Sequence, residues 1–118
     1  MKVVCNPTFG GFSWPQEIIY TFHIGAFSSS REARTDPKII AALEEILKPF
    51  IEREKSNDFY RSWNTPGDPE LRILEIPDDC SDWMVTEYDG AETIYFVKEG
   101  KLYTVTDDGE YERVNEAD

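Results

Sequence analysis

The sequence predicts an α+β fold, in which an antiparallel meander sheet of five or six strands carries one main amphipathic helix packed on one face. Apolar residues recur at helical spacing after an Asp-Pro pair at positions 36 and 37. Short β-branched and aromatic runs fill the chain from position 71 onward. Glycines at positions 90, 100 and 109 separate these runs, and this regular spacing is typical of consecutive hairpins.

Length and composition predict one folded domain over residues 1–118. A chain of 118 residues can bury a core without disulfides or a metal. Its 40% hydrophobic and 14% aromatic content excludes a disordered chain. Two segments are expected to lack regular structure, namely an irregular loop over residues 56–70 and a frayed tail over residues 115–118.

The N-terminal segment predicts a strand followed by a glycine turn. Residues 2–5 form a short apolar run, and the Asn-Pro pair that follows ends it because proline offers no backbone N–H. Residues 9–12 read Phe-Gly-Gly-Phe. Two adjacent glycines permit positive φ and a close approach of the backbone, so we expect a flexible turn between two aromatic rings.

A short helix is expected next. Ser13 can cap it, and Pro15 suits its first turn. Residues 18–24 are β-branched and aromatic, so helix and strand compete there, and we favour helix. Residues 25–34 read as a polar connection.

The main helix is predicted over residues 37–48. Asp36 can accept hydrogen bonds from the first turn, and Pro37 suits the first helical position. Pro49 removes a backbone donor, so it is expected to end or kink the helix before a second short turn over residues 50–55. The apolar face consists of Ile39, Ile40, Leu43, Ile46, Leu47, Phe50 and Ile51.

The second half of the chain predicts strands over residues 71–76, 83–88, 93–97, 101–106 and 111–114. The face of the sheet opposite the helix would be solvated or covered by a partner. Exposed tyrosines on that face would suit a homo-oligomer, and the candidates are Tyr95, Tyr103 and Tyr111.

The net charge of −12 is unevenly distributed. Residues 1–74 hold 10 acidic and 9 basic side chains, whereas residues 75–118 hold 14 acidic and 3 basic ones. An acidic surface repels phosphates, which argues against direct nucleic-acid binding. Three interpretations of this acidic surface stay open: it keeps the protein soluble, it attracts a basic host protein, or it imitates the phosphate backbone of DNA.

The two cysteines, Cys5 and Cys80, form neither a CxxC pair nor a disulfide framework, so a reducing compartment fits best. The N-terminus lacks the apolar stretch of a signal peptide. No run reaches the roughly 18 apolar residues of a membrane span. We therefore expect a cytoplasmic protein without a membrane partner.

No motif identifies a reaction. His23 is the only histidine, which excludes a His-rich metal site, and its apolar neighbours favour a hydrogen-bonded structural role. The carboxylates gather near turns without the spacing of a Ca²⁺ loop. We predict no catalytic residue, no metal site and no cofactor, and therefore no enzyme.

The best candidate for a ligand site is the Phe-Gly-Gly-Phe turn, where bare backbone N–H groups lie between two aromatic rings. An anionic ligand would also need arginine, because the guanidinium fork matches phosphate geometry. The ligand-binding residues that we predict are Phe9, Gly10, Gly11, Phe12, Arg31, Arg34, Trp63 and Tyr88.

Four motifs follow one another along residues 1–97. They are a strand with a Phe-Gly-Gly-Phe-Ser turn at residues 9–13, Arg-Thr-Asp-Pro at residues 34–37, Leu-Glu-Ile-Pro at residues 74–77, and Glu-Tyr-Asp-Gly at residues 87–90 with Glu92 beyond. In this order they resemble a family of small bacteriophage and prophage proteins. The resemblance implies a viral protein that acts in the host cytoplasm, and it implies no reaction.

The chain departs from that family in two places. It has a longer insertion at residues 48–69, and from residue 98 it replaces the family's basic His-Arg-aromatic ending with a strand-forming segment. If the basic ending formed part of a site, that site is altered here.

Three functions remain open in this setting. A non-enzymatic binding protein would counter host defence by sequestering a nucleotide-derived immune signal. An acidic interaction inhibitor or DNA mimic would instead cover a basic host protein. A small metal-dependent hydrolase is the third alternative. We favour the first because the chain offers few catalytic groups.

Overall fold

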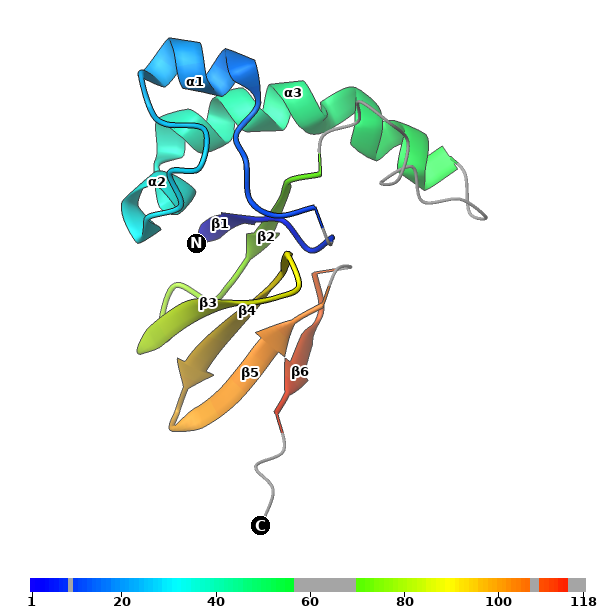
Figure 1. The fold of residues 1–118 in the computed structure, drawn as a ribbon. Coiled ribbons are helices and arrows are strands. Elements are labelled where there is room, and N and C mark those ends of the chain that lie inside the picture. Colours follow the sequence, from blue (N-terminus) through cyan, green and yellow to red (C-terminus); the bar gives the residue numbers. More distant parts are fainter. Residues whose placement is uncertain (9, 57–69, 107–108, 115–118) are drawn as a thin grey trace.

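A computed structural model describes residues 1–8, 10–56, 70–106 and 109–114 (Figure 1). These residues form an α+β fold with three helices and two antiparallel sheets, one of two strands and one of four. The helices are α1 (Gln16–Phe22), α2 (Arg31–Thr35) and α3 (Pro37–Ser56). The strands are β1 (Lys2–Cys5), β2 (Arg72–Glu75), β3 (Asp82–Tyr88), β4 (Ala91–Lys98), β5 (Lys101–Val105) and β6 (Tyr111–Arg113).

The strands do not form the single meander of five or six strands that the sequence predicts. β3, β4, β5 and β6 follow one another in an antiparallel meander, whereas β1 pairs only with β2. The β1–β2 ribbon lies between the helices and the meander, as Figure 1 shows. It is a layer of its own because its two faces pack against different elements.

Alternation along β1 explains this layering. Val3, Val4 and Cys5 are all fully buried. Since successive side chains point to opposite faces of a strand, Val3 and Cys5 join the cluster on the meander side, and Val4 joins the cluster on the helix side. A strand buried on both faces reads as a continuous apolar run, which is what residues 3–5 are.

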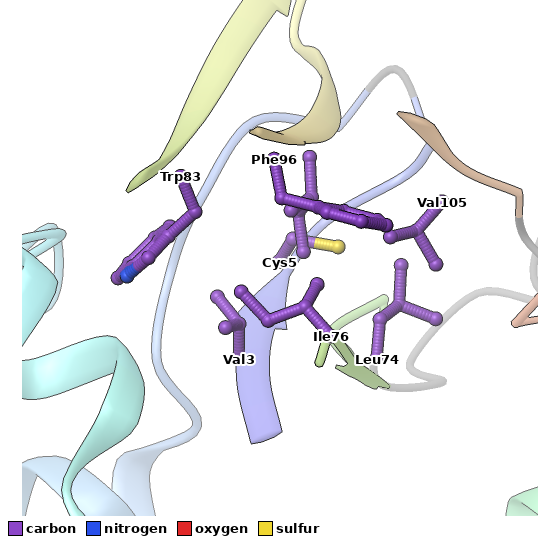
Figure 2. Close-up of a cluster of buried hydrophobic side chains, with 8 residues drawn as sticks. Val3, Cys5, Leu74, Ile76, Trp83, Phe96 and Val105 are labelled. Carbon is purple, nitrogen blue, oxygen red and sulfur yellow. The ribbon is translucent and has the colours of Figure 1, made fainter. Parts of the chain in front are cut away.

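The cluster between the ribbon and the meander is aromatic at its centre. Phe96 stacks on Tyr103 with ring centroids 5.2 Å apart and meets Tyr111 edge-on at 5.0 Å. Figure 2 shows Trp83 at the margin of the cluster, on the side of the cyan helical segment. The buried members are Val3, Cys5, Leu74, Ile76, Trp83, Ile94, Phe96 and Val105.

The second cluster attaches the helices to the other face of the ribbon. The expected apolar face of α3 supplies half of its buried members, and α1 adds Ile18. Its buried members are Val4, Trp14, Ile18, Ile39, Ile40, Leu43, Leu47 and Leu71. The helix thus packs on the β1–β2 ribbon and not on the meander, which corrects the expected helix-on-meander arrangement.

Two helix boundaries differ from those expected. Pro49 lies inside α3, which continues to Ser56. Pro49 and Glu45 are both exposed, so water can satisfy the Glu45 carbonyl that loses its i→i−4 partner. Ser13 does not cap α1. The N-cap residue is Pro15, and no side chain accepts a hydrogen bond from the first turn.

α2 lies within the segment expected to be a polar connection. Ser30 caps it by accepting a hydrogen bond from the Ala33 N–H. The Ser-x-x-Ala pattern is a weak cap signal in a helix of only five residues. Asp36 then accepts from the Lys38 N–H at the start of α3, as the sequence predicts.

The hairpin turns follow the predicted signals. Asp89 and Gly90 both have positive φ, as do Glu99 and Gly100. Each pair joins two strands directly, which is the geometry of a two-residue type I′ turn. The expected loop over 56–70 and the tail over 115–118 lie largely outside the described residues, apart from Ser56 and Glu70 at the borders of the loop.

The aromatic cluster predicts that truncating two large side chains, Phe96 and Tyr88, changes the free energy of unfolding by very different amounts. Phe96 is 1% exposed, whereas Tyr88 is 82% exposed. We expect Phe96→Ala to lower the free energy of unfolding by about 3–5 kcal/mol, and Tyr88→Ala to change it by about 0.5 kcal/mol or less. Denaturant unfolding followed by tryptophan fluorescence measures both. Equal losses in the two variants would contradict this description of the core.

Candidate functional site

A buried ion pair joins α2 to β4. Arg34 Nη1 donates to Glu92 Oε1 at 2.9 Å, and Nη2 donates to Glu92 Oε2 at 2.6 Å. Both side chains are 6% exposed. A bidentate pair of this kind is stronger and more directional than a single charged hydrogen bond. It fixes the position of the helical layer relative to the meander.

The same ion pair closes the free edge of β1. Arg34 Nη1 donates to the Val4 carbonyl at 3.0 Å, and Glu92 Oε1 accepts from the Asn6 N–H at 2.9 Å. The Glu92 N–H in turn donates to the Asn6 carbonyl at 2.8 Å. The two side chains therefore present a donor and an acceptor to β1 much as a neighbouring strand would.

The remaining contacts of Arg34 leave it little capacity for a ligand. Its Nε donates to the Ser29 carbonyl at 2.8 Å, and its Cζ lies 4.2 Å from the centroid of the Phe12 ring. The sequence predicts that Arg34 and Phe12 both bind a planar or anionic small ligand. In the structure they contact each other, and the guanidinium is occupied by protein acceptors.

Asn6 organises the glycine turn that follows β1. Its Nδ2 donates to the Gly11 carbonyl at 2.5 Å and to Glu70 Oε2 at 3.1 Å. Its Oδ1 accepts from the Thr8 N–H at 2.9 Å and from the Thr8 hydroxyl at 2.6 Å. Asn6 is 1% exposed, so this amide is a structural group with its hydrogen-bonding capacity used.

The two glycines of the turn differ in what a side chain would meet. A Cβ on Gly10 would overlap the carboxylate of Glu70, so a larger residue there would displace the end of this flexible side chain. Gly11 has a φ of +79°, which L side chains rarely adopt. The Gly11 N–H donates to the Gly90 carbonyl at 3.2 Å, and this bond holds the turn against the β3–β4 hairpin.

A pocket of about 410 Å³ lies between this turn, the start of α1 and the middle of α3. We call it the glycine-turn pocket. Its lining residues are Asn6, Gly10, Gly11, Ser13, Trp14, Pro15, Glu17, Ile46, Phe50, Glu70 and Leu71. Trp14 is fixed there because its indole N–H donates to the Ser28 carbonyl at 2.6 Å.

The glycine-turn pocket is lined by both aromatic and acidic residues. The aromatic ones are Trp14 and Phe50, and the acidic ones are Glu17 and Glu70. The described lining residues include no lysine or arginine. The pocket therefore favours a flat ligand whose buried edge donates hydrogen bonds or carries positive charge.

A second hollow of about 420 Å³ runs between α2 and β3. We call it the β3 groove. Arg31 lies over the Trp83 ring, with its Cζ 4.4 Å from the ring centroid, and its Nη2 donates to Asp82 Oδ1 at 3.2 Å. The groove is lined by Ser29, Arg31, Arg34, Trp83, Met84, Val85, Glu87 and Glu92.

The structure divides the predicted ligand-binding residues. Gly10 and Gly11 line the glycine-turn pocket, whereas Arg31 and Arg34 line the β3 groove. Tyr88 lines neither and is 82% exposed near the hairpin tip. The predicted residues at positions 9 and 63 lie outside the described residues. The arginines are therefore not placed to supply charge to a ligand at the glycine turn.

Three acidic residues that were not predicted as site residues belong to these sites: Glu70, Glu17 and Glu92. The position of Glu92 beside the Asp-Gly turn is typical of a solvated acid, but its strand periodicity indicates burial. It lies two residues before Ile94 and four before Phe96 on a strand, and period-two alternation places all three on one buried face. Nothing in the local sequence distinguishes Glu17 or Glu70 from surface acids.

The histidine and the two cysteines lie outside both hollows. His23 was expected to have a hydrogen-bonded structural role among apolar neighbours, but it is exposed at the C-terminal end of α1, where its backbone is left-handed. Cys5 and Cys80 form no disulfide, and both contact the same core cluster. Among the described residues, no three His, Cys, Asp or Glu side chains are placed to hold a metal ion. Within the same part of the chain, no helix is long and apolar enough to cross a bilayer.

Comparisons with protein-family models, with curated proteins and with solved structures gave no significant match.

Removing one member of the Arg34–Glu92 pair should be much more costly than removing a surface ion pair. Glu92→Ala leaves a buried guanidinium without its counter-charge, and we expect a loss of about 3–5 kcal/mol in the free energy of unfolding. The exposed Lys2–Glu44 pair at 3.2 Å is the matched control, and Glu44→Ala should cost about 1 kcal/mol or less.

The double variant Arg34→Met with Glu92→Met tests whether the two side chains act as a unit. Its loss in the free energy of unfolding should be smaller than the sum of the losses in the single variants Arg34→Met and Glu92→Met, because neither charge is then left alone. Denaturant unfolding of the three variants measures the coupling. Additive losses would show that the ion pair contributes nothing as a pair.

The Asp82 carboxyl predicts a defined pH dependence. A hydrogen bond from the Trp83 backbone N–H, and then the Arg31 guanidinium, hold the pKa of Asp82 below its ordinary value of 3.8. A lowered pKa stabilises the fold above the unfolded value, and this contribution is lost as the pH falls through the folded value. Below about pH 5 the wild type should therefore lose stability more steeply than Asp82→Asn.

Thermal unfolding across this acidic range is the measurement. Asp89→Asn, which changes an exposed acid in the β3–β4 turn, serves as the control. Parallel pH profiles for wild type and Asp82→Asn would show that Arg31 and Trp83 do not hold this carboxylate in solution.

Proposed function

We propose that the protein is a non-enzymatic binding protein that sequesters a nucleotide-derived small molecule, with the base of that molecule held in the glycine-turn pocket. The observation that supports this most is the composition of the pocket, whose lining combines the aromatic residues Trp14 and Phe50 with the acidic residues Glu17 and Glu70. A nucleobase has flat apolar faces and carries amino and imino donors at its edge.

The chemistry of the pocket determines the orientation of such a ligand. Carboxylate oxygens accept hydrogen bonds from an exocyclic amine and repel a phosphate. The base would therefore enter first, and its phosphates would stay at the mouth of the pocket. This differs from the arginine-assisted phosphate site expected from the sequence, because Arg31 and Arg34 line the other hollow.

Sequestration, as distinct from catalysis, requires tight burial and complementary hydrogen bonds. A volume of about 410 Å³ lies within the usual range for small-molecule sites, which is about 300–1,000 Å³. In the phage setting that the sequence resemblance implies, the ligand would be a nucleotide-derived immune signal of the host. Binding it in the host cytoplasm would lower its free concentration and so counter host defence.

A second candidate function is an acidic inhibitor that covers a basic host protein. One observation favours it: Glu92 is the buried member among the described acids of the second half, and nine others are exposed. Changing Asp78 and Asp79 to asparagine would weaken such binding and leave the glycine-turn pocket intact. The exposed acids are Glu75, Asp78, Asp79, Asp82, Glu87, Asp89, Glu99, Glu110 and Glu112.

The proposed binding function predicts a stoichiometric mass gain in native mass spectrometry. The protein would be mixed with nucleosides, cyclic mononucleotides and cyclic dinucleotides, and separately with deproteinised extract of infected cells. Gly10→Ala places a methyl group where the Glu70 carboxylate lies. Because a hydrogen bond to a charged group contributes about 1.5–3 kcal/mol, we expect affinity to fall about tenfold or more.

Gly25→Ala is the matched control, because a Cβ at Gly25 meets no atom within 4 Å. It should bind the ligand as the wild type does. Glu70→Gln keeps an acceptor for Asn6 and removes the charge, so it tests the carboxylate directly. An unchanged mass across the panel and the extract would refute the proposed function, and equal losses in both glycine variants would remove the pocket from it.

A further inference from the structure

The edges of the two sheets differ in how far side chains satisfy their outward backbone groups. The edge of β1 is closed by the Arg34–Glu92 pair. The edge of β2 receives the Tyr111 hydroxyl, which donates to the Glu75 carbonyl at 2.9 Å. Of the two margins of the meander, β6 has three residues and β3 has seven. β3 therefore presents the longest edge without a neighbouring strand in the described part of the chain (Figure 1).

The hairpin register shows which groups of β3 face outward. The two-residue turn makes Tyr88 and Ala91 a hydrogen-bonded pair. Because hydrogen-bonded and non-hydrogen-bonded pairs alternate, residues 83, 85 and 87 direct their N–H and C=O groups away from β4. The Trp83 N–H is taken by Asp82 Oδ1 at 2.8 Å, which agrees with this parity.

Val85 and Glu87 are left with outward backbone groups. Among the hydrogen bonds of the described residues, none involves the outward N–H or C=O group of Val85 or Glu87. An added strand pairs with such groups at alternate residues, and two residues of this parity provide a donor and an acceptor each. The edge is thus able to accept a short extended segment.

Space for that segment lies beside the edge. The β3 groove, about 420 Å³, is bounded on one side by Val85 and Glu87 and on the other by Arg31. Met84 also borders the groove, although alternation along β3 directs its side chain to the other face of the sheet, where it is 46% exposed. Side chains of an added strand would alternate between the groove and this face.

Charge determines the chemistry of the occupant. Asp82, Glu87 and Asp89 are exposed along β3 and its turn, and residues 75–118 hold 14 acidic against 3 basic side chains. Acids on an edge strand oppose pairing between identical copies, because like charges would meet. Since Asp82 is already paired with Arg31, Glu87 and Asp89 are the acids here that attract a basic segment and orient it.

We propose that the edge of β3 binds an extended, lysine- or arginine-containing segment of a partner protein by strand addition. The segment pairs its backbone with Val85 and Glu87. Its basic side chains lie on the groove side near Glu87, and its apolar side chains lie against Met84. The proposal concerns a surface separate from the glycine-turn pocket and holds whether or not that pocket binds a nucleotide.

Fluorescence anisotropy with defined peptides tests the proposal. The probe is a labelled peptide of sequence Thr-Lys-Val-Lys-Val-Lys-Thr, and its counterpart has glutamate in place of each lysine. The lysine peptide should bind with an affinity that falls as salt is added, and the glutamate peptide should not bind. A third peptide carries N-methyl groups on alternate residues, which keep the charge and remove the strand donors. It should bind about tenfold or more weakly.

A pair of charge-matched variants locates the site. Glu87→Gln with Asp89→Asn removes two acids beside β3, and Glu110→Gln with Glu112→Gln removes two acids at β6. The first variant should weaken lysine-peptide binding about tenfold, and the second about twofold or less. Glutamine at 87 keeps an acceptor for the Gly90 N–H, so the turn is preserved.

Each remaining outcome contradicts the proposal. Equal binding of the N-methylated peptide would mean that charge alone attracts the probe. Equal losses in the two charge variants would mean a diffuse acidic surface. No binding of the lysine peptide, or a dimer of the protein itself that the β3 variant abolishes in sedimentation, would overturn the assigned occupant. None of these results depends on the nucleotide assay.

Discussion

The buried Arg34–Glu92 pair is the interaction on which the arrangement of the three layers depends. Moving two charges out of water costs several kcal/mol per ion, so such a pair needs further hydrogen bonds to be tolerated. Here the further bonds come from the β1 backbone at Val4 and Asn6 and from the Ser29 carbonyl. The pair takes the place of a strand that β1 does not have, and in doing so it joins α2, β1 and β4.

Both candidate sites lie next to this connection. Asn6, whose N–H bonds to Glu92, borders the glycine-turn pocket. Arg34 and Glu92 themselves border the β3 groove. The pocket is also bound to the hairpin through the Gly11–Gly90 hydrogen bond. A change that loosened the ion pair would therefore disturb both hollows, and a loss of function in such a variant could not be assigned to either site.

Local signals were sufficient for much of the fold. The turns at Asp89–Gly90 and Glu99–Gly100 were predicted because positive φ restricts residue choice, and the main helix was predicted from its cap and its apolar face. The division into two sheets was not, since the apolar run at residues 3–5 is compatible with any buried strand. Pro49 was overestimated as a helix terminator, because its effect depends on whether water reaches the Glu45 carbonyl.

The candidate site was predicted less well than the fold, because the role of a charged residue depends on its distant partner. Arg34 and Glu92 are 58 positions apart, and each read as a solvated side chain or a ligand contact. Once the pair is formed, the positive charge expected at the glycine turn is used elsewhere, and Glu17 and Glu70 remain at the pocket. The glycine turn does border a pocket, but the charged residues that line this pocket are acidic and not the basic ones expected. Counting charges along the sequence could not reveal this, because a count does not show that Arg34 in the first half of the chain and Glu92 in the second half neutralise each other in the interior.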